Sequence, residues 1–293
     1  MVQRGLDWID CLCTRPLIQR NVLFSFYLQL YPAISWGLVT TVLPPATIEK
    51  KVQALYFKSL PLMGINGNIK KEWQSLPTMY QGLGLPCFPL VALAKKISFL
   101  QENWGNTGVA QSDALSLAYD DFIMEVGLYG NPLSWEYINY GQLATQATWF
   151  SNLWQLCHTY QATVSINKSG RQITPICKNN RSIMSEFYCI GFCGNQLVGL
   201  NTVQKYKHFI HVSDMILCDG RTIDPFSLSD EQILSVQHVF SREEPTHANF
   251  SLRRSAISSL CEGTTRLPYA LGPFVLPPHL EVYWYTNLDS SIL

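Results

Sequence analysis

A long run without any charged side chain, from Asn21 to Ile48, is the feature that most constrains how this chain can fold. About 20 consecutive apolar residues can span a bilayer, so the run is long enough for a membrane segment. Polar side chains punctuate it, however, Pro32 lies near its middle, and a double proline closes it. We therefore favour one or two buried helices, over residues 16–31 and 33–42, which are kinked at Pro32 and covered by other helices.

The charges that the chain does carry are distributed unevenly. Only 14% of the 293 residues are charged and 47% are apolar, so the chain can bury a large core. Residues 1–100 hold ten Lys and Arg against four Asp and Glu (+6), whereas residues 101–293 hold eleven against seventeen (−6). This asymmetry permits a contact between the N-terminal third and nucleic acid or anionic lipid, and argues against such a contact over the rest.

The segment after the uncharged run has the pattern of an amphipathic helix. Its apolar positions at helical spacing are Ile48, Val52, Leu55 and Tyr56. The basic residues Lys50, Lys51 and Lys58 lie largely on the other side, where they could follow a phosphate backbone or merely solvate the helix. A second helix, predicted over residues 89–101, carries Lys95 and Lys96, which are weaker candidates for the same role.

The glycine pair between these helices does not make a phosphate loop. Gly82 and Gly84 predict a tight turn. The sequence Gly-Leu-Gly-Leu-Pro lacks a third glycine and the Lys-Ser/Thr of a P-loop, and no convincing strand precedes it. We therefore expect no nucleotide cofactor.

Two adjacent aspartates, Asp120 and Asp121, raise the question of a magnesium site of the polymerase type. Apolar residues recur at helical spacing from Leu115 to Val126, which predicts a helix rather than a hairpin turn. A two-metal phosphoryl-transfer site also needs a further aspartate from another strand, and no upstream residue has suitable surroundings. We therefore expect no catalytic residue in this chain.

Four residues in the second half have the order of a metal site. They are Cys189, Cys193, His208 and His211, which can be read as C-x3-C-x14-H-x2-H. A zinc finger usually has about twelve residues between its pairs and three to five between its histidines. The pattern thus gives only weak zinc candidates, and ordinary surface or interface residues are the alternative.

From these patterns we expect a mainly α fold: a basic multi-helix module over residues 1–110, then an aromatic-rich helical module over residues 111–293. The short polar segment 103–113 is the candidate linker. Minor β hairpins are expected in the second module, for example at the turn dipeptide Asp219-Gly220.

The cysteines and the ends of the chain bear on its surroundings. Nine cysteines with irregular spacing and no leader segment favour an intracellular location, in cytoplasm or nucleus. Residues 281–293 alternate like a strand and stop without a clear end, so we expect a C-terminal truncation. Low charge is consistent with an exposed apolar face, which makes self-association possible.

The order of the segments resembles the region after the palm in reverse transcriptases of non-LTR-type retroelements. The resemblance lies on LQLYPAISWGLVTTVLPPATIEKKVQALYFKSL, YQGLGLP, YGQLAT and HVSDMILCDGRTI, and covers about residues 15–230. In that family a helical thumb follows the catalytic palm. Relatives tend to have histidine within the block that here contains Gln142, so no role for that histidine is carried over.

What the resemblance implies is a fragment related to RNA-directed DNA polymerases that lacks the palm and is not catalytic by itself. Its thumb-like helix bundle would hold an RNA or DNA template–primer duplex, with the lysines of the basic helix as phosphate contacts. Its other partner would be the missing palm of a longer polyprotein. The alternative is a helical scaffold or interaction protein, attached to a membrane through residues 21–43.

Overall fold

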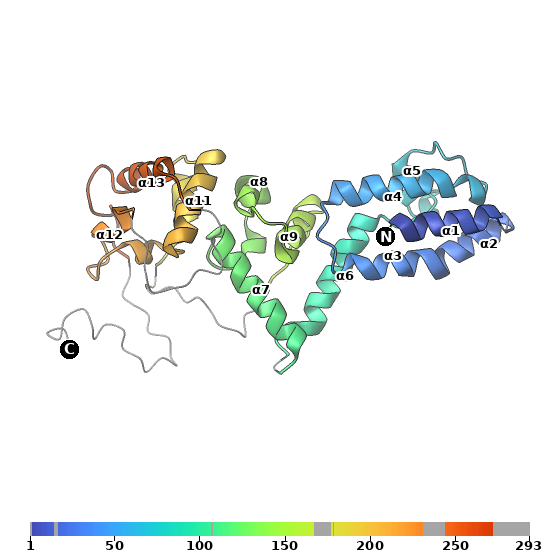
Figure 1. The fold of residues 1–293 in the computed structure, drawn as a ribbon, viewed down its shortest axis with the longest axis horizontal. Coiled ribbons are helices and arrows are strands. Elements are labelled where there is room, and N and C mark those ends of the chain that lie inside the picture. Colours follow the sequence, from blue (N-terminus) through green and yellow to red (C-terminus); the bar gives the residue numbers. More distant parts are fainter. Residues whose placement is uncertain are drawn as a thin grey trace. The chain divides into compact units, whose positions relative to one another are not determined.

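The computed structural model of the chain describes residues 2–14, 17–106, 108–166, 177, 179–230 and 244–271. The fold is mainly helical, as predicted (Figure 1). It divides into two compact units: Met1–Phe122 with Leu133–Asn167, and Ile123–Pro132 with Lys168–Leu293. The candidate linker at 103–113 joins two helices inside the first unit, so the compact units divide the chain at positions other than residue 110.

Residues 39–44 of the uncharged run form a turn and a loop, and the residues before them lie in one continuous helical stretch with no break at Pro32. It consists of α2 (Gln19–Ser25), a π-helical turn η1 (Phe26–Leu30) and α3 (Tyr31–Leu38). Its buried stripe falls on every fourth residue and comprises Val22, Phe26, Leu30, Ile34 and Leu38. One side of the stretch is therefore buried and the other is not, although nearly all residues on both sides are apolar or neutral.

The π turn explains how a stripe with a period of four stays on one face. In an α-helix a four-residue step overshoots one turn by about 40°, so the stripe would drift around the axis. A π turn takes an extra residue, which moves the stripe back. The turn lies next to Pro32, which has no N–H to donate, and the backbone N–H of Tyr31 bonds to the carbonyl of Phe26 five residues back.

Among the described residues, no helix has both the length and the apolar character that crossing a bilayer requires. The helices predicted for this run are thus present, but they are buried on one side only, since Phe24, Leu28 and Trp36 are exposed, and a π turn precedes Pro32.

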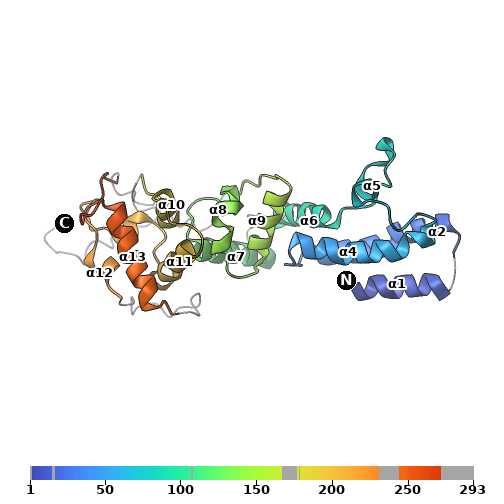
Figure 2. The same ribbon diagram turned by 90° about the horizontal axis from the view of Figure 1, so that it is seen from above.

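The N-terminal helices of the first unit form a bundle. Helices α1 (Val2–Thr14) and α4 (Pro45–Ser59) lie side by side in two views (Figures 1 and 2). Their approach is close at Gly5, where a Cβ atom would lie 2.7 Å from Cδ1 of Leu55. Helix α4 buries the four apolar positions predicted from its periodicity, Ile48, Val52, Leu55 and Tyr56. Pro44 is the residue before its first turn.

The rest of the first unit is built around aromatic side chains. Helices α6 (Phe88–Asn103), α7 (Ala110–Val126) and α9 (Trp149–Thr159) supply most of them. Phe150 stacks on Phe122 and lies edge-on to Tyr119, with centroid distances of 6.1 and 5.2 Å. Thr148 caps the start of α9 by accepting a hydrogen bond from the Ser151 N–H.

Several short elements complete the first unit and its connections. They are η2 (Pro61–Met63), α5 (Lys71–Ser75), η3 (Thr78–Tyr80), η4 (Pro132–Ser134), α8 (Tyr137–Tyr140) and η5 (Gly141–Leu143).

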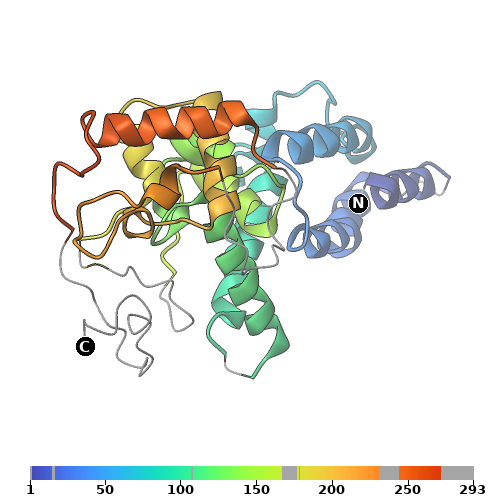
Figure 3. The same cartoon turned by 60° about the vertical axis from the view of Figure 1, so that its left-hand side comes forward.

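The second unit packs helices around buried polar groups. Its helices are α10 (Ile183–Cys189), α11 (Asn195–Lys207), η6 (Val212–Met215), α12 (Pro225–Leu228) and α13 (His247–Leu260). The orange-red helix α13 packs across the yellow α11 (Figure 3). Two buried cations reach backbone carbonyls of α12: Nζ of Lys207 donates to the Phe226 carbonyl and Nε of Arg253 to the Ser227 carbonyl. Carbonyl dipoles thus hold these charges inside the unit.

The predicted β hairpins are reduced to isolated bridges in the described part of the second unit. Ile216 pairs with Ile223 across the Asp219-Gly220 turn, and Gly220 has a φ of +69°. The Asp219 carboxylate accepts hydrogen bonds from the backbone N–H groups of Arg221 and Thr222, and these bonds with the Thr222 hydroxyl lower its pKa to about 2. The strand expected at residues 281–293 lies outside the described residues.

The glycine turn gives the first testable prediction. Residues Leu83 and Leu85 donate backbone hydrogen bonds to carbonyls of α5, so the turn lies directly against that segment. A Cβ at Gly82 would overlap the carbonyl oxygen of Leu76, whereas Gly84 has a φ of +64° with only the Thr78 methyl group nearby, at 3.2 Å. We expect Gly82→Ala to lower the free energy of unfolding by about 2–4 kcal/mol and Gly84→Ala by about 1 kcal/mol.

Urea unfolding followed by circular dichroism measures both changes. Equal destabilisation by the two substitutions would contradict the close backbone approach at Gly82.

Candidate functional site

The outer face of α4 carries the basic residues predicted from the sequence. Lys50, Lys51 and Lys58 are all exposed, and none of them makes an ion pair with a described residue. The helix period explains why these lysines lie close together. Lys51 and Lys58 are seven residues apart, which is about two turns, so they share a side of the helix. The sequence-predicted set is thus brought together as one basic strip.

An aromatic residue lies in the same strip and was not singled out by sequence reasoning. Phe57 is 57% exposed and stands seven residues after Lys50, on the same side of α4. Its position beside Lys50 could have been predicted by extending the helical wheel to the apolar residues that the core does not use. The strip therefore combines positive charge with one exposed ring.

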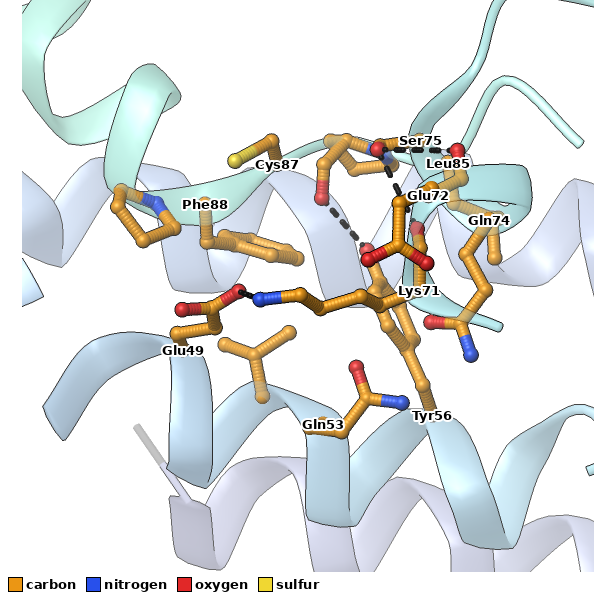
Figure 4. A pocket seen from close by; sticks show the side chains of 13 residues that line it. Glu49, Gln53, Tyr56, Lys71, Glu72, Gln74, Ser75, Leu85, Cys87 and Phe88 are labelled. Atoms are coloured by element: carbon orange, nitrogen blue, oxygen red, sulfur yellow. Dashed lines mark hydrogen bonds and ion pairs between the residues drawn. The ribbon is translucent and has the colours of Figure 1, made fainter. Parts of the chain in front are cut away.

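The only acidic residue of α4 is engaged elsewhere. Glu49 accepts a hydrogen bond from Nζ of Lys71 on α5 at 2.9 Å, and this carboxylate raises the pKa of Lys71 (Figure 4). About half of both side chains is exposed, so the pair contributes little to stability. It nevertheless keeps the Glu49 charge beside Lys71 instead of beside the lysine strip.

A cavity of about 140 Å³ lies between α4, α5 and the segment leading into α6. Tyr56 extends from α4 and donates to the Pro86 carbonyl, and burial raises its pKa (Figure 4). The Cys87 sulfur lies 3.5 Å from the Tyr160 hydroxyl. The cavity is smaller than common ligand pockets, and its lining places no histidine beside the thiol, so we assign it no chemistry.

The two lysines predicted on α6 have different environments. Lys95 is exposed, but Lys96 is fully buried and cannot reach a phosphate on the surface. Its Nζ donates to the Val39 carbonyl at 3.2 Å and lies 4.7 Å from the centroid of the Trp149 ring. Lys96 is therefore removed from the set of phosphate contacts, because its side chain belongs to the core.

The aspartate pair lies on a helix, as expected. Asp120 and Asp121 belong to α7, and partial burial raises the pKa of Asp121. In the described part of the chain, no three His, Cys, Asp or Glu residues are grouped in a way that could hold a metal ion.

The four zinc candidates do not form a site. Cys189 and Cys193 are exposed thiols, whereas His211 is buried, with its ring 4.7 Å from that of Tyr129. Nδ1 of His211 lies 3.7 Å from Asp214, whose carboxylate accepts the N–H groups of Ile210 and His211. His208 ends α11 in a left-handed conformation. The two histidines cap helices and the two thiols face solvent, so the geometry does not support zinc.

Comparisons with known proteins return no relatives. No protein-family model matches the chain, and neither a curated protein nor a solved structure is similar to it.

Burial of Lys96 predicts a pH dependence of stability. Burial lowers the pKa of Lys96 to about 7, well below the unfolded value of 10.5. Below pH 7 both states bind the proton and the full cost of burying the charge is present. Between pH 7 and 10.5 the unfolded state binds more protons, so this cost falls as the pH rises. The free energy of unfolding should therefore rise by about 1–2 kcal/mol from pH 7 to pH 9 relative to Lys96→Met.

Urea unfolding of the wild type, Lys96→Met and Lys95→Met at both pH values tests this. The exposed Lys95 is the matched control, and its substitution should leave the pH dependence of the wild type unchanged. If Lys96→Met shows the same pH dependence as the wild type, Lys96 is not the titrating group.

Proposed function

We propose that the first unit is a thumb-like module that binds a nucleic-acid duplex, within a protein related to retroelement reverse transcriptases, and that this chain does not polymerise by itself. The observation that supports the proposal most is the strip of Lys50, Lys51 and Lys58 on the outer face of α4. Their ammonium groups are exposed and make no ion pair with a described residue, so they are available to phosphates.

The residue types in the strip favour contacts with the phosphate backbone of a nucleic acid over sequence-specific contacts with its bases. Lysine is a compact point charge that neutralises phosphate without requiring a fixed geometry. Bidentate contacts to base edges are made mostly by arginine, asparagine and glutamine, and the one such residue of α4, Gln53, is half-buried and lines the cavity beside α5. Phe57 offers a ring on which a base or a ribose could stack. Binding should thus be insensitive to sequence and sensitive to salt.

The chain's lack of polymerase motifs is part of the same proposal. The resemblance on which it rests begins after the palm, where the catalytic aspartates of that family lie. Template-dependent nucleotide incorporation by the purified chain would defeat the claim of inactivity.

A second candidate function, a scaffold that docks on another protein, is favoured by one specific observation. The outer side of the uncharged helical stretch exposes large apolar side chains: Phe24 is 64% exposed, Leu28 61% and Trp36 84%. Such a patch is typical of interaction surfaces. A monodisperse monomer by light scattering, with unchanged solubility of Trp36→Ser, would count against it.

The lysine strip predicts a specific loss of binding. The affinity for an RNA–DNA hybrid should fall with salt in proportion to about three to five phosphate contacts. The triple change Lys50→Glu, Lys51→Glu and Lys58→Glu should abolish binding, because it replaces three attractive charges with repulsive ones. Fluorescence anisotropy at several salt concentrations measures both effects.

A matched triple change controls for net charge. Arg4, Arg20 and Lys70 are also exposed in the first unit but lie outside α4, and changing them to glutamate alters the net charge equally. This control should retain most of the binding. Equal losses in both triple variants would mean that charge alone, and not the strip, drives association.

A further inference from the structure

A larger cavity of the first unit lies away from the lysine strip. Its volume is about 310 Å³, within the range of small-molecule pockets. One wall is formed by the segment from Leu133 to Tyr137, which leads into α8, and the other by the second half of α9 and the turn after it. Helices α8 and α9 lie next to each other in both perpendicular views (Figures 1 and 2).

Aromatic rings line this cavity. Trp135, Tyr137, Trp154 and His158 all contribute to its lining. The Tyr137 ring lies edge-on to Trp154, with centroids 5.1 Å apart, and stacks on His158 at 5.6 Å. Nε1 of Trp154 donates to the Trp135 carbonyl at 2.9 Å, which fixes one wall to the other. The rings are thus held by contacts that exist without a guest.

The remaining lining is neutral or negative. Glu136 contributes a carboxylate and is exposed, and Asn139 donates a hydrogen bond to it. Burial raises the pKa of the Cys157 thiol to about 11, so this side chain is neutral at physiological pH. A carboxylate beside several aromatic rings has the chemistry of a cation site.

The sequence around the residues that line the cavity also carries negative charge. From residue 97 to residue 167 the chain contains no Lys or Arg but six acidic residues: Glu102, Asp113, Asp120, Asp121, Glu125 and Glu136. The lining of the cavity itself contains no Lys or Arg, so a phosphate would find no ionic partner here, whereas the Glu136 carboxylate would attract a cation. This distinguishes the cavity from the lysine strip of α4, which has the opposite charge.

We propose that the cavity lined by Trp135, Tyr137, Trp154 and Glu136 binds an organic cation, of the class of quaternary ammonium groups and charged side chains of other proteins. The partly exposed rings of Trp135 and Tyr137 would attract the positive charge, and Glu136 would balance it at the rim. This inference is independent of nucleic-acid binding by α4, because it involves other residues and the opposite charge.

Choline and its neutral isostere 3,3-dimethylbutan-1-ol test the charge requirement. Both have the same shape, but only choline carries a cationic centre. Isothermal titration calorimetry with the full chain should show choline binding about tenfold or more tighter than the neutral compound. Equal affinities would overturn the proposal, because the cavity would then be merely apolar.

Variants locate the site without disturbing the core. Glu136→Gln keeps the shape of an exposed side chain and should weaken choline binding several-fold, and Trp135→Leu should weaken it further. Glu102→Gln removes an exposed carboxylate outside the cavity and should have no effect. If Glu136→Gln and Trp135→Leu, each shown by circular dichroism to be folded, both bind choline as the wild type does, the proposal fails.

Two further ligands identify the source of the cation. N-acetyl-trimethyllysine amide binding more tightly than N-acetyl-arginine amide would support a methylated lysine as guest, and the reverse order would support an arginine side chain. Tighter binding of adenosine or uridine monophosphate than of either cation would overturn the proposal and point to a nucleobase.

Discussion

The carbonyl oxygen of Val39 is the point on which the packing of the first unit depends. It lies where α3 ends, and the last carbonyls of a helix have no partner within the helix. Nζ of Lys96 on α6 and Nε1 of Trp149 on α9 both donate to it, at 3.2 and 2.8 Å. Nδ2 of Asn152 on α9 donates to the nearby Leu43 carbonyl at 2.9 Å. Side chains of two helices thus complete the end of a third.

This arrangement explains why a chain with few charges buries a lysine. The ammonium group is held by a carbonyl dipole and an aromatic face rather than by a carboxylate. Buried cations of the second unit have the same two kinds of partner. Lys207 lies over the Phe226 ring and Arg253 over the Phe209 ring, and both donate hydrogen bonds to carbonyls of α12. Such contacts depend on nearby dipoles and are little affected by dissolved salt, in contrast to charges on the surface.

Much of the helical fold could be predicted from periodicity, because a helix that buries one face has apolar residues at helical spacing in its sequence. The apolar face of α4, the helix around Asp120 and the basic strip all follow from that rule. Partners across the core do not, since nothing local links Lys96 to Val39 or to Trp149. Adjacent lysines on α6 therefore looked alike in sequence although only Lys95 reaches solvent. The aromatic cavity was missed for the same reason, because its two walls come from separate segments.

The π turn gives the uncharged helical stretch one residue more than a regular helix with the same buried face would need. Val22 and Ile34 both lie on the buried stripe, although twelve residues of a regular α-helix would place them about 120° apart. Loss of a single residue between Phe26 and Leu30 would give a regular helix in which these two residues lie within about 20° of each other. The π turn is thus equivalent to a one-residue insertion that the stretch accommodates without changing which face it buries.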